Sequence, residues 1–303
     1  MSTEKTFFPE EFLTKYKALL GDEWDTFFEC ITTKKPKSFW VNTNKTTVEE
    51  VKKSLKLKKI DFEEFDFDKR AFFINMEKPG DLEEFKNGKI SLQEKAAMLP
   101  VIALNPTVQD IVLDACAAPG MKTIQLSNLM NNKGRILACD VNSERIKSLE
   151  INKKKYSLIN ATAKRIDFRN LLPKYKEKFD KILLDAPCSS EGLVRKDREA
   201  LREWSHKLVD RKAQTQKELI FAAFDLLKKG GEMIYSTCSF SPEENENVVN
   251  YLLTQRKNAE VMNVEELLRG VKIRKNTLCE NCVRLYPQDN DTQQFFLAKI
   301  RKN

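Results

Sequence analysis

The fold class is decided by one stretch, Asp114-Ala115-Cys116-Ala117-Ala118-Pro119-Gly120-Met121-Lys122-Thr123. It begins inside an apolar run at residues 111–115 and leads into a helical pattern at residues 123–130. Small side chains let the backbone pass close to a ligand, and Gly120 can adopt torsions that other residues cannot. A strand, a tight turn and a helix in this order are typical of the first unit of a doubly wound sheet, in which the helix N-terminus attracts negative charge.

Apolar strands alternate with helical patterns outward from this stretch. Strand patterns cover residues 111–115, 135–139, 162–166, 181–184 and 232–236, and helical patterns cover residues 123–130, 143–154 and 212–228, the last ended by Gly230-Gly231. Residues 283–286 and 295–300 could form a closing hairpin. This alternation predicts an α/β fold with a doubly wound, mainly parallel Rossmann-like sheet over residues 91–303.

Residues 1–90 differ in composition, being rich in Lys, Glu and Phe, with no glycine between Asp22 and Pro79. Two extended pieces, 38–42 and 71–74, are separated by an amphipathic segment. The predicted buried helix positions are Phe12, Tyr16, Leu19 and Leu20 in the first helix, and Val48, Val51, Leu55 and Leu57 in the amphipathic segment. Helices mixed with short strands predict a small α+β domain.

The length, the cysteine count and the net charge restrict the class of protein. No apolar run in the 303 residues approaches the ~20 that cross a bilayer, and the first ten residues lack the pattern of a secretory signal. Seven scattered cysteines favour free thiols in a reducing cytoplasm. The net charge of +8 favours a phosphate-rich partner. We therefore expect a cytoplasmic protein, without a membrane partner, that acts as a monomer.

Acidic residues end the next two predicted strands. Asp140 lies 26 residues after Asp114, and Asp167 follows Ile166. An acid at the first position can accept both hydroxyls of a ribose, for which the usual spacing is about 20 residues, and Asp167 can accept a hydrogen bond from an adenine amino group. Either acid alone could equally cap a helix, but three in register on successive strands are less expected by chance.

The cofactor motif is neither a G-x-G-x-x-G fingerprint, because it has one glycine, nor a P-loop, because the G-x-x-x-x-G-K spacing is absent. With the two acids it indicates an adenosine-containing cofactor without a pyrophosphate, and S-adenosylmethionine fits that description best. The predicted cofactor-binding residues are Cys116, Ala117, Ala118, Pro119, Gly120, Met121, Lys122, Asp140, Arg145, Asp167 and Asp185.

Two cysteines and a carboxylate follow the fourth and fifth strands. One strand ends in Asp185-Ala186-Pro187-Cys188 and the next in Ser236-Thr237-Cys238. Because the ends of parallel strands meet at one edge of the sheet, these groups should share a cleft. Cysteines in turns just past strands are expected to be reactive.

Two thiols beside a methyl donor suit the chemistry of cytosine. Its carbon 5 is too electron-poor to attack a sulfonium methyl directly, and a thiolate that adds at carbon 6 makes carbon 5 nucleophilic. Asp185 could stabilise the protonated ring nitrogen, while Lys122 could lower the thiol pKa and orient Asp185. The target base must leave its stack to reach such a pocket.

Two further features carry less weight. His206, the single histidine, lies in a polar helix start, which favours a surface role over Cys–His catalysis. Cys279 and Cys282 have the spacing of metal ligands, but no second pair or nearby histidine completes four ligands. We therefore expect no metal.

At these motifs the sequence closely resembles the RNA 5-methylcytosine methyltransferase family, the NOL1/NOP2/Sun group. The matching segments are 114–123, Asp140, Asp167, 185–189, 237–239 with the following 242–246, a lead-in helix at 91–106 and a closing strand pair at 284–299. The resemblance implies that Cys238 is the nucleophile and that Cys188 assists product release. It also implies that residues 1–90, with 37–45, form an RNA-recognition-like domain ahead of a methyltransferase domain at 91–303.

The sequence departs from the family pattern at a few positions. Trp40 stands where the family usually has Arg, which puts one phosphate contact in doubt, and Met121, Ser190 and Gln294 replace usual glycines. None of these changes removes a chemical group from the site.

The substrate inference rests on resemblance alone. The compact length and the segment Arg284-Leu285-Tyr286-Pro287 resemble archaeal tRNA enzymes, whereas Arg195-Lys196-Asp197-Arg198 and Trp204 resemble bacterial rRNA members. We expect tRNA as the substrate and rRNA as the alternative. A protein or small-molecule methyltransferase, and a non-catalytic RNA-binding or assembly factor, are the other classes.

Overall fold

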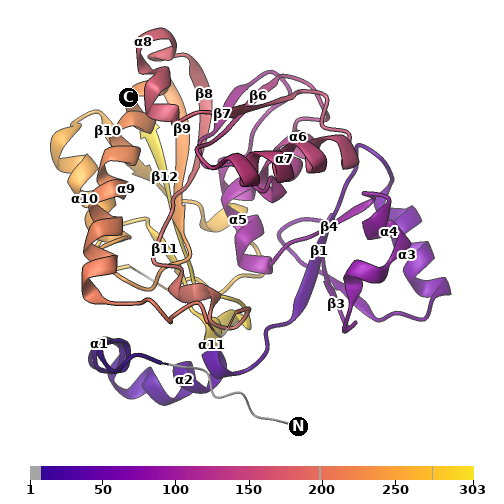
Figure 1. Cartoon of the computed structure of the whole chain (residues 1–303), viewed down its shortest axis with the longest axis horizontal. Helices are drawn as coiled ribbons and strands as arrows, with labels where there is room; N and C mark the ends of the chain where they lie inside the picture. The colour runs from indigo at the N-terminus through magenta and orange to yellow at the C-terminus, as the bar shows by residue number, and fades with distance from the viewer. Residues whose placement is uncertain (1–7, 198, 275) are drawn as a thin grey trace.

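The structure, a computed structural model, describes residues 8–303 except 198 and 275. Two sheets occupy different parts of the chain, a four-stranded one near the N-terminus and an eight-stranded one in the remainder (Figure 1). The first ten elements are α1 (Glu10–Leu20), α2 (Trp24–Thr32), β1 (Lys37–Val41), α3 (Val48–Leu57), β2 (Phe62–Glu64), β3 (Ala71–Ile74), α4 (Glu83–Lys86), β4 (Ile90–Leu92), α5 (Lys95–Leu104) and β5 (Ile111–Asp114). Those that follow are α6 (Met121–Leu129), β6 (Arg135–Asp140), α7 (Ser143–Lys155), β7 (Ala161–Arg165), α8 (Leu172–Tyr175), β8 (Phe179–Asp185), α9 (His206–Leu226), β9 (Leu227–Thr237), α10 (Glu246–Gln255), β10 (Ala259–Met262), β11 (Val283–Leu285), α11 (Pro287–Asn290) and β12 (Phe295–Lys302).

The large sheet has the order β10-β12-β9-β8-β5-β6-β7, with β11 paired to β12. The pairs among β5, β6, β7, β8 and β9 are parallel, and β12 runs antiparallel to β9. The chain builds outward from β5 through β6 to β7 and then returns to the other side of β5 with β8. This reversal creates a topological switch point between β5 and β8, which is where ligands bind in doubly wound sheets.

Helices cover both faces of this sheet, and the alternation of side chains along each strand decides which face each residue serves. Val112 and Leu183 face the α5 side, in one buried cluster. Their neighbours Leu113 and Leu184 face α9 and α10, in a second cluster. Figure 1 shows α9 and α10 together on one side of the strands, with α5 on the other. The predicted mainly parallel Rossmann-like sheet is therefore confirmed.

The small sheet has the order β2-β3-β1-β4 and is antiparallel throughout. It packs α3 over its own apolar cluster, which includes Phe39, Val51 and Phe72. The first two helices belong elsewhere: Phe12 on α1 and Phe27 on α2 pack against residues of the large-sheet part of the chain. The predicted division at residue 90 falls within β4, and the division into 1–90 and 91–303 stays a prediction.

Several sequence-based boundaries need correction. The helix predicted at 212–228 ends at Leu226, and Gly230-Gly231 lie inside β9, where Gly230 has a φ of 77° and the β8–β9 register shifts. Leu19 and Leu57 are 49% and 77% exposed, because each lies in the last turn of its helix, beyond the core. The short strands β2 and β4 and the helix α2 were not predicted. The closing hairpin of β11 with β12 is confirmed.

Candidate active site

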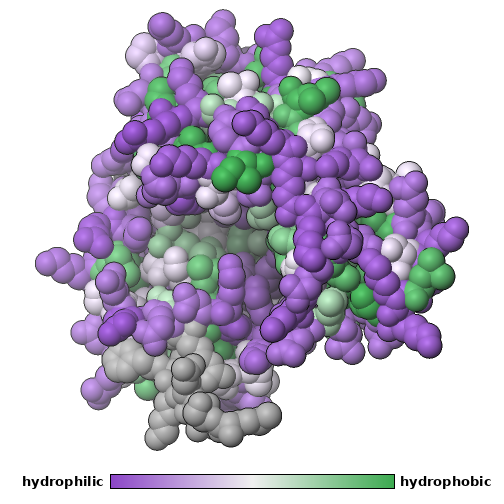
Figure 2. Space-filling model, turned by 45° about the vertical axis from the view of Figure 1, so that its right-hand side comes forward, coloured by the Kyte–Doolittle hydropathy of each residue, from purple (hydrophilic) through white to green (hydrophobic). Residues whose placement is uncertain are grey.

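A cavity of about 530 Å³ opens at the carboxyl ends of β5, β6, β7, β8 and β9. Figure 2 shows one face of the molecule hollowed near its centre, with mainly hydrophilic residues around the rim. The cavity brings together these sequence-predicted residues: Cys116, Ala117, Ala118, Pro119, Met121, Lys122, Asp140, Arg145, Asp167, Asp185, Cys188 and Cys238. Gly120 alone among the predicted residues does not line it.

Gly120 shapes the loop in another way. Its φ of 105° lies in the region that favours glycine, and an added Cβ would lie 2.5 Å from Leu149 Cδ1. It directly precedes α6, so that the helix begins at Met121 as the loop leaves the cavity. Gly120 therefore allows both the turn and the close packing against α7, and the predicted need for unusual torsions at this position is confirmed.

Asp140 holds the loop to the second strand. Its carboxylate accepts hydrogen bonds from the N–H groups of Ala118, at 3.3 Å, and Asn142, at 2.9 Å. Arg145 pairs with Asp140 at 3.3 Å and donates to the Ala118 carbonyl. Asn142, and not Asp140, caps α7. The cap alternative is thus wrong for Asp140.

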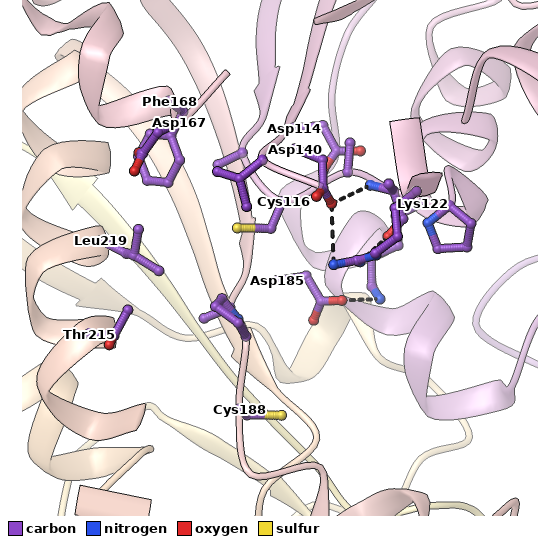
Figure 3. Close-up of a pocket in the computed structure, with 18 of the residues that line it drawn as sticks. Asp114, Cys116, Lys122, Asp140, Asp167, Phe168, Asp185, Cys188, Thr215 and Leu219 are labelled. Atoms are coloured by element: carbon purple, nitrogen blue, oxygen red, sulfur yellow. Dashed lines mark hydrogen bonds and ion pairs between the residues drawn. The ribbon is translucent and has the colours of Figure 1, made fainter. Parts of the chain in front are cut away.

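Asp167 has the features of both alternatives, a helix cap and a residue of the cofactor cavity. It caps the short 3₁₀ turn at 168–171 by accepting the Arg169 N–H, and it lines the cavity. Hydrogen bonding from Arg169 lowers the pKa of the Asp167 carboxyl. Phe168 and Leu219 lie beside it and form an apolar wall (Figure 3).

Asp185 and Lys122 form an ion pair in the cavity wall (Figure 3), with Lys122 Nζ donating to Asp185 Oδ2 at 2.7 Å. The second carboxylate oxygen accepts from Ser236 Oγ at 3.0 Å. Both oxygens are therefore fixed, and the predicted orientation of Asp185 by Lys122 is present in the structure.

The two cysteines meet at the same end of the cavity, with their sulfurs 3.0 Å apart. Both are free thiols and partly exposed. The contact with Cys188 and burial raise the pKa of the Cys238 thiol, and the Lys122 charge only offsets part of this rise. The Lys122 charge thus lowers the thiol pKa, as predicted, but by less than burial and the Cys188 contact raise it.

Asp114 lies beneath the loop, 1% exposed, and accepts a hydrogen bond from Thr123 Oγ1 at 2.7 Å. Burial raises its pKa to about 7. The acid that ends β5 is thus only partly ionised near neutral pH, and it supports the turn through its hydrogen bond with Thr123.

A second cavity, of about 590 Å³, continues from the first toward the small sheet. The two share Lys122, Arg145, Asp185 and Cys238. The second is also lined by four lysines from three segments, Lys35, Lys37, Lys78 and Lys196, and by Glu77 and Glu94. A cleft in which basic side chains outnumber acidic ones therefore leads to the cysteines from the side of the small sheet.

Sequence reasoning missed part of the cavity wall. Thr215 and Leu219 come from α9, and Ile166, Phe168 and Arg169 follow β7. The helical pattern of α9 was recognised, but its period does not tell which turn reaches a neighbouring strand end. The apolar residue directly after Asp167 was the signal that could have indicated Phe168.

The structure explains two of the positions at which the sequence departs from the family pattern, Trp40 and Ser190. Trp40 is fully buried and donates from Nε1 to Asn128 Oδ1 at 2.9 Å, so this position cannot reach a phosphate. Arg70 lies over its ring, 4.9 Å from the centroid. Ser190 has a φ of 63°, in the region where glycine is favoured.

Two basic residues singled out in the sequence are structural. Arg195, only 8% exposed, donates to the Thr292 carbonyl at 2.9 Å and pairs with Asp291 at 2.7 Å. Arg284 is also buried and pairs with Glu246 at 2.5 Å. Arg198 lies outside the described residues.

Other sequence features lie away from the cavity. His206 is exposed at the start of α9, whereas Cys279 and Cys282 are buried. Over residues 8–303, with 198 and 275 left aside, no group of three or more His, Cys, Asp or Glu side chains could hold a metal. Within the same residues, no helix has both the length and the apolar character needed to span a membrane.

The sheet order, the loop after β5 and the cavity at the switch point define a Rossmann-like methyltransferase. The chain belongs to the RsmB/F methyltransferase family: the family described as 16S rRNA methyltransferase RsmB/F matches residues 101–301, and the N-terminal domain of 16S rRNA methyltransferase RsmF matches residues 8–95. This family, the NOL1/NOP2/Sun group, uses S-adenosylmethionine to methylate carbon 5 of cytosine in RNA.

Named relatives agree with this assignment. Ribosomal RNA small subunit methyltransferase F of Vibrio atlanticus is 36% identical over 98% of this chain, and its counterpart in Aliivibrio salmonicida is 35% identical over 99%. The chain spans 64% and 65% of the length of these two relatives. A methyltransferase homolog from Pyrococcus horikoshii has a TM-score of 0.86 at 32% identity, covering 98% of this chain and 96% of the other. NSun6 from the same organism, solved with SFG, shares the fold, with a TM-score of 0.87 at 23% identity over 98% and 99% of the two chains.

Proposed function

We propose that this protein methylates carbon 5 of cytosine in RNA with S-adenosylmethionine as the donor, and that its substrate is small-subunit ribosomal RNA. The observation that carries the proposal is the 3.0 Å approach of the Cys188 and Cys238 sulfurs, in the same cavity as Asp185. Covalent catalysis on a pyrimidine needs a thiol that attacks carbon 6, and a second thiol and a fixed carboxylate beside it can assist release and bind the ring.

The cavity residues fit the cofactor. Asp140 keeps acceptor capacity for ribose hydroxyls beyond its two N–H donors. Asp167 can accept from the adenine amino group, with Phe168 and Leu219 against the ring. When bound, S-adenosylmethionine supplies an electrophilic methyl group. Figure 3 shows Asp167 and Phe168 at the opposite end of the view from Cys188, so the adenosine end would lie away from the thiols.

The chain's own residues divide the work on the base. Cys238 adds through its sulfur to carbon 6, which makes carbon 5 nucleophilic. The ring nitrogen that gains electron density takes up the proton that the Cys238 thiol loses, and Asp185, held by Lys122 and Ser236, accepts the hydrogen bond from that N–H. After methylation, Cys188 helps to remove the carbon 5 proton, and the bond between Cys238 and carbon 6 breaks.

The pKa of the Cys238 thiol is raised, so the sulfur must lose its proton as it adds to carbon 6. The charge of Lys122, which lowers this pKa, favours the loss of the proton. Resting thiols that are neutral are also less easily oxidised than thiolates.

The basic cleft suits an RNA chain. Lys35, Lys37, Lys78 and Lys196 line it on the way to Cys238, and lysines at phosphates gain affinity from counterion release. Residues 1–90 would act as the RNA-recognition part and residues 91–303 as the methyltransferase domain. A cytoplasmic monomer remains our proposal for the state of the protein.

The ribosomal substrate is favoured over tRNA by the relatives, which are named as ribosomal RNA methyltransferases at 35–36% identity. Arg284 and Arg195, which suggested tRNA and rRNA respectively, are both buried in ion pairs, so neither residue distinguishes the two substrates.

Tritiated methyl-donor assays with small-subunit ribosomal RNA and with total tRNA would test both parts. We expect label in the ribosomal RNA at one or a few cytosines, mapped by bisulfite sequencing with and without the gene. Label confined to tRNA would overturn the substrate, and label in neither RNA, with either naked RNA or whole subunits, would overturn the activity.

A further inference from the structure

Two buried carboxylates join the loops that carry the cysteines. Glu191 follows Cys188 in the loop after β8, and Glu244 follows Cys238 in the loop after β9. Both glutamates have an exposed fraction of 0%. Each one binds mainly the loop on which the other stands.

Glu191 holds the loop of Cys238. Its Oε2 accepts the backbone N–H groups of Phe240, at 2.6 Å, and Ser241, at 3.1 Å. Its Oε1 accepts from Ser241 Oγ at 2.8 Å. The neighbouring Gly192 N–H donates to the Cys238 carbonyl at 2.7 Å, so the two loops are joined directly beside the sulfur.

Glu244 holds the loop of Cys188 in return. Its Oε2 accepts the Ser189 N–H at 2.9 Å and Gln216 Nε2 at 2.8 Å. The same Gln216 nitrogen donates to the Pro187 carbonyl at 3.0 Å. The residues on both sides of Cys188 are therefore tied to Glu244.

Ser239 lies between the two carboxylates. Its Oγ is 2.9 Å from Glu191 Oε2 and 2.8 Å from Glu244 Oε1, and it also accepts the Ser241 N–H at 3.0 Å. A hydroxyl has one hydrogen to donate. If both glutamates were ionised, one of the two short oxygen–oxygen contacts would have no proton between its atoms. The geometry thus requires one further proton.

The distribution of donors places that proton on Glu244. Glu191 accepts five hydrogen bonds, from Trp204 Nε1, Ser239 Oγ, Phe240 N, Ser241 N and Ser241 Oγ. The Oε1 of Glu244 meets only Ser239, so a proton there completes a chain from Glu244 through Ser239 to Glu191. Burial and the charge of Glu191 raise the pKa of Glu244.

Among the contacts of the described residues, no cation takes the place of this proton in offsetting the charge of the two carboxylates. The donors that reach them are all neutral. The titratable and charged groups around the pair are Lys15 and Tyr16 on α1, Asp185 and Cys188 at the end of β8, Tyr235 and Cys238 on and after β9, Glu243 beside Lys15, Glu246 at the start of α10, Arg284 on β11, and His206 next to Trp204. Lys15 reaches Ser241 Oγ and Glu243 rather than either buried glutamate.

We propose that Glu191 and Glu244 are positioning residues that form a crossed clamp between the two cysteine loops, closed by one proton that Glu244 holds and shares through Ser239. The clamp sets the distance between the Cys188 and Cys238 sulfurs. Its consequence for methyl transfer rests on the proposed function, because it fixes the attacking thiol relative to the releasing thiol.

Disulfide trapping measures this distance without RNA or methyl donor. Diamide, a diazene oxidant, takes up the two electrons and two protons of two neighbouring thiols, which form an S–S bond while the diazene becomes a hydrazine. The rate for Cys188 with Cys238 can be followed by alkylation and peptide mass spectrometry, which separate this pair from Cys279 and Cys282. A failure of methylation would leave this measurement unaffected.

Isosteric variants separate the two glutamates. In Glu244→Gln the amide NH₂ can donate to Ser239 as the protonated acid does, so we expect a trapping rate within twofold of the wild type. In Glu191→Gln an NH₂ would oppose the N–H donors of the Cys238 loop, and Glu244→Ala leaves the Ser189 N–H unpaired. We expect both to slow trapping by about tenfold or more. Glu243→Gln is the matched control, since Glu243 binds Lys15 outside the clamp, and should trap at the wild-type rate.

The pH dependence provides a second readout. Ionisation of Glu244 as the pH rises through its raised pKa opens the clamp in the wild type but cannot occur in Glu244→Gln. The ratio of the wild-type rate to the Glu244→Gln rate should therefore fall with rising pH, while the shared titration of the thiols cancels from the ratio.

Thermal unfolding and S-adenosylmethionine binding verify that each variant folds. A wild-type trapping rate in folded Glu191→Gln or Glu244→Ala would overturn the clamp. Slowing of Glu244→Gln as large as that of Glu244→Ala would overturn the assignment of the proton, and this comparison stands even if Glu191→Gln does not fold.

Discussion

The sulfurs of Cys188 and Cys238 lie 3.0 Å apart although the residues are separated by 50 positions. The approach follows from the parallel pairing of β8 with β9, in which Asp185 is opposite Ser236. The loops that leave these two strand ends necessarily start side by side. The relationship turns two sequence motifs into one reactive pair, and the first predictions concern it.

Replacement of Cys238 by alanine should abolish methyl transfer and leave cofactor binding intact, because the sulfur attacks the base whereas Asp140 and Asp167 hold the cofactor. Tritium transfer to RNA and titration of S-adenosylmethionine binding measure the two properties. Activity retained by this variant would remove Cys238 from the role of nucleophile.

Replacement of Cys188 by alanine should trap a covalent adduct between protein and RNA, since attack through Cys238 continues while release fails. A denaturing gel with substrate RNA should show a slower band. The double variant lacking both thiols is the control and should show none. Absence of the band in the single variant would count against the release role.

Replacement of Asp185 by asparagine should lower the rate of methyl transfer by about 100-fold or more, the usual contribution of a positioned acid–base group. The ring nitrogen then loses its charged partner, and Lys122 loses its own. Single-turnover rates measure the effect. Ser236→Ala, which removes only the second hydrogen bond to Asp185, should cost less, about tenfold or under; equal losses in the two variants would contradict the assignment.

Asp114 should make the stability of the protein depend on pH. Its folded pKa of about 7 exceeds the unfolded value, so the stability it contributes is complete below pH 4 and is lost as the pH rises toward 7. The free energy of unfolding of the wild type, relative to Asp114→Asn, should fall by about 2–3 kcal/mol between pH 5 and pH 8. Urea titrations at both pH values measure this difference, and parallel pH profiles would refute the raised pKa.

Trp40 should stabilise the junction between the small sheet and α6. Trp40→Phe removes the donor to Asn128 and leaves a buried carbonyl oxygen unpaired, so the free energy of unfolding should fall by about 1–3 kcal/mol. Tyr251→Phe, on an exposed ring, is the control and should change it by less than about 0.5 kcal/mol. Replacement of Lys196, which lines the cleft, should weaken RNA binding. Trp40→Phe should leave the RNA affinity of the folded protein unchanged, because Trp40 is buried.

The predictability of the fold follows the strength of each local pattern. Strands β5, β6 and β8 are mainly apolar and largely buried, and their positions were predicted to within two residues. Only the apolar second half of β9 was predicted, because its first half carries Lys228, Lys229 and two glycines. The three-residue strands β2 and β4 carry too few residues for a period, and they exist only because β1 and β3 offer edges to pair with. The end of α9 was misplaced because Gly230-Gly231 serve a strand irregularity, a role that depends on β8.

The candidate site also has a part that the sequence predicts and a part that it does not. Its chemical groups follow strand ends, and a parallel sheet gathers strand ends at one edge, so Asp140, Asp167, Asp185 and both cysteines could be placed together from the sequence. The wall formed by Thr215 and Leu219 could not, because it depends on how α9 lies across the sheet.

The sequence by itself determined the class of fold, the cofactor loop and the two thiols, because strand periodicity and motif spacing are properties of neighbouring residues. Only the tertiary structure decided that Trp40, Arg195 and Arg284 are interior, that burial and the Cys188 contact outweigh the Lys122 charge at the Cys238 thiol, and that Glu191 and Glu244 cross-bind the cysteine loops. These properties depend on burial and on contacts between segments distant in the chain, which set the free energy of each charge and which no local pattern contains.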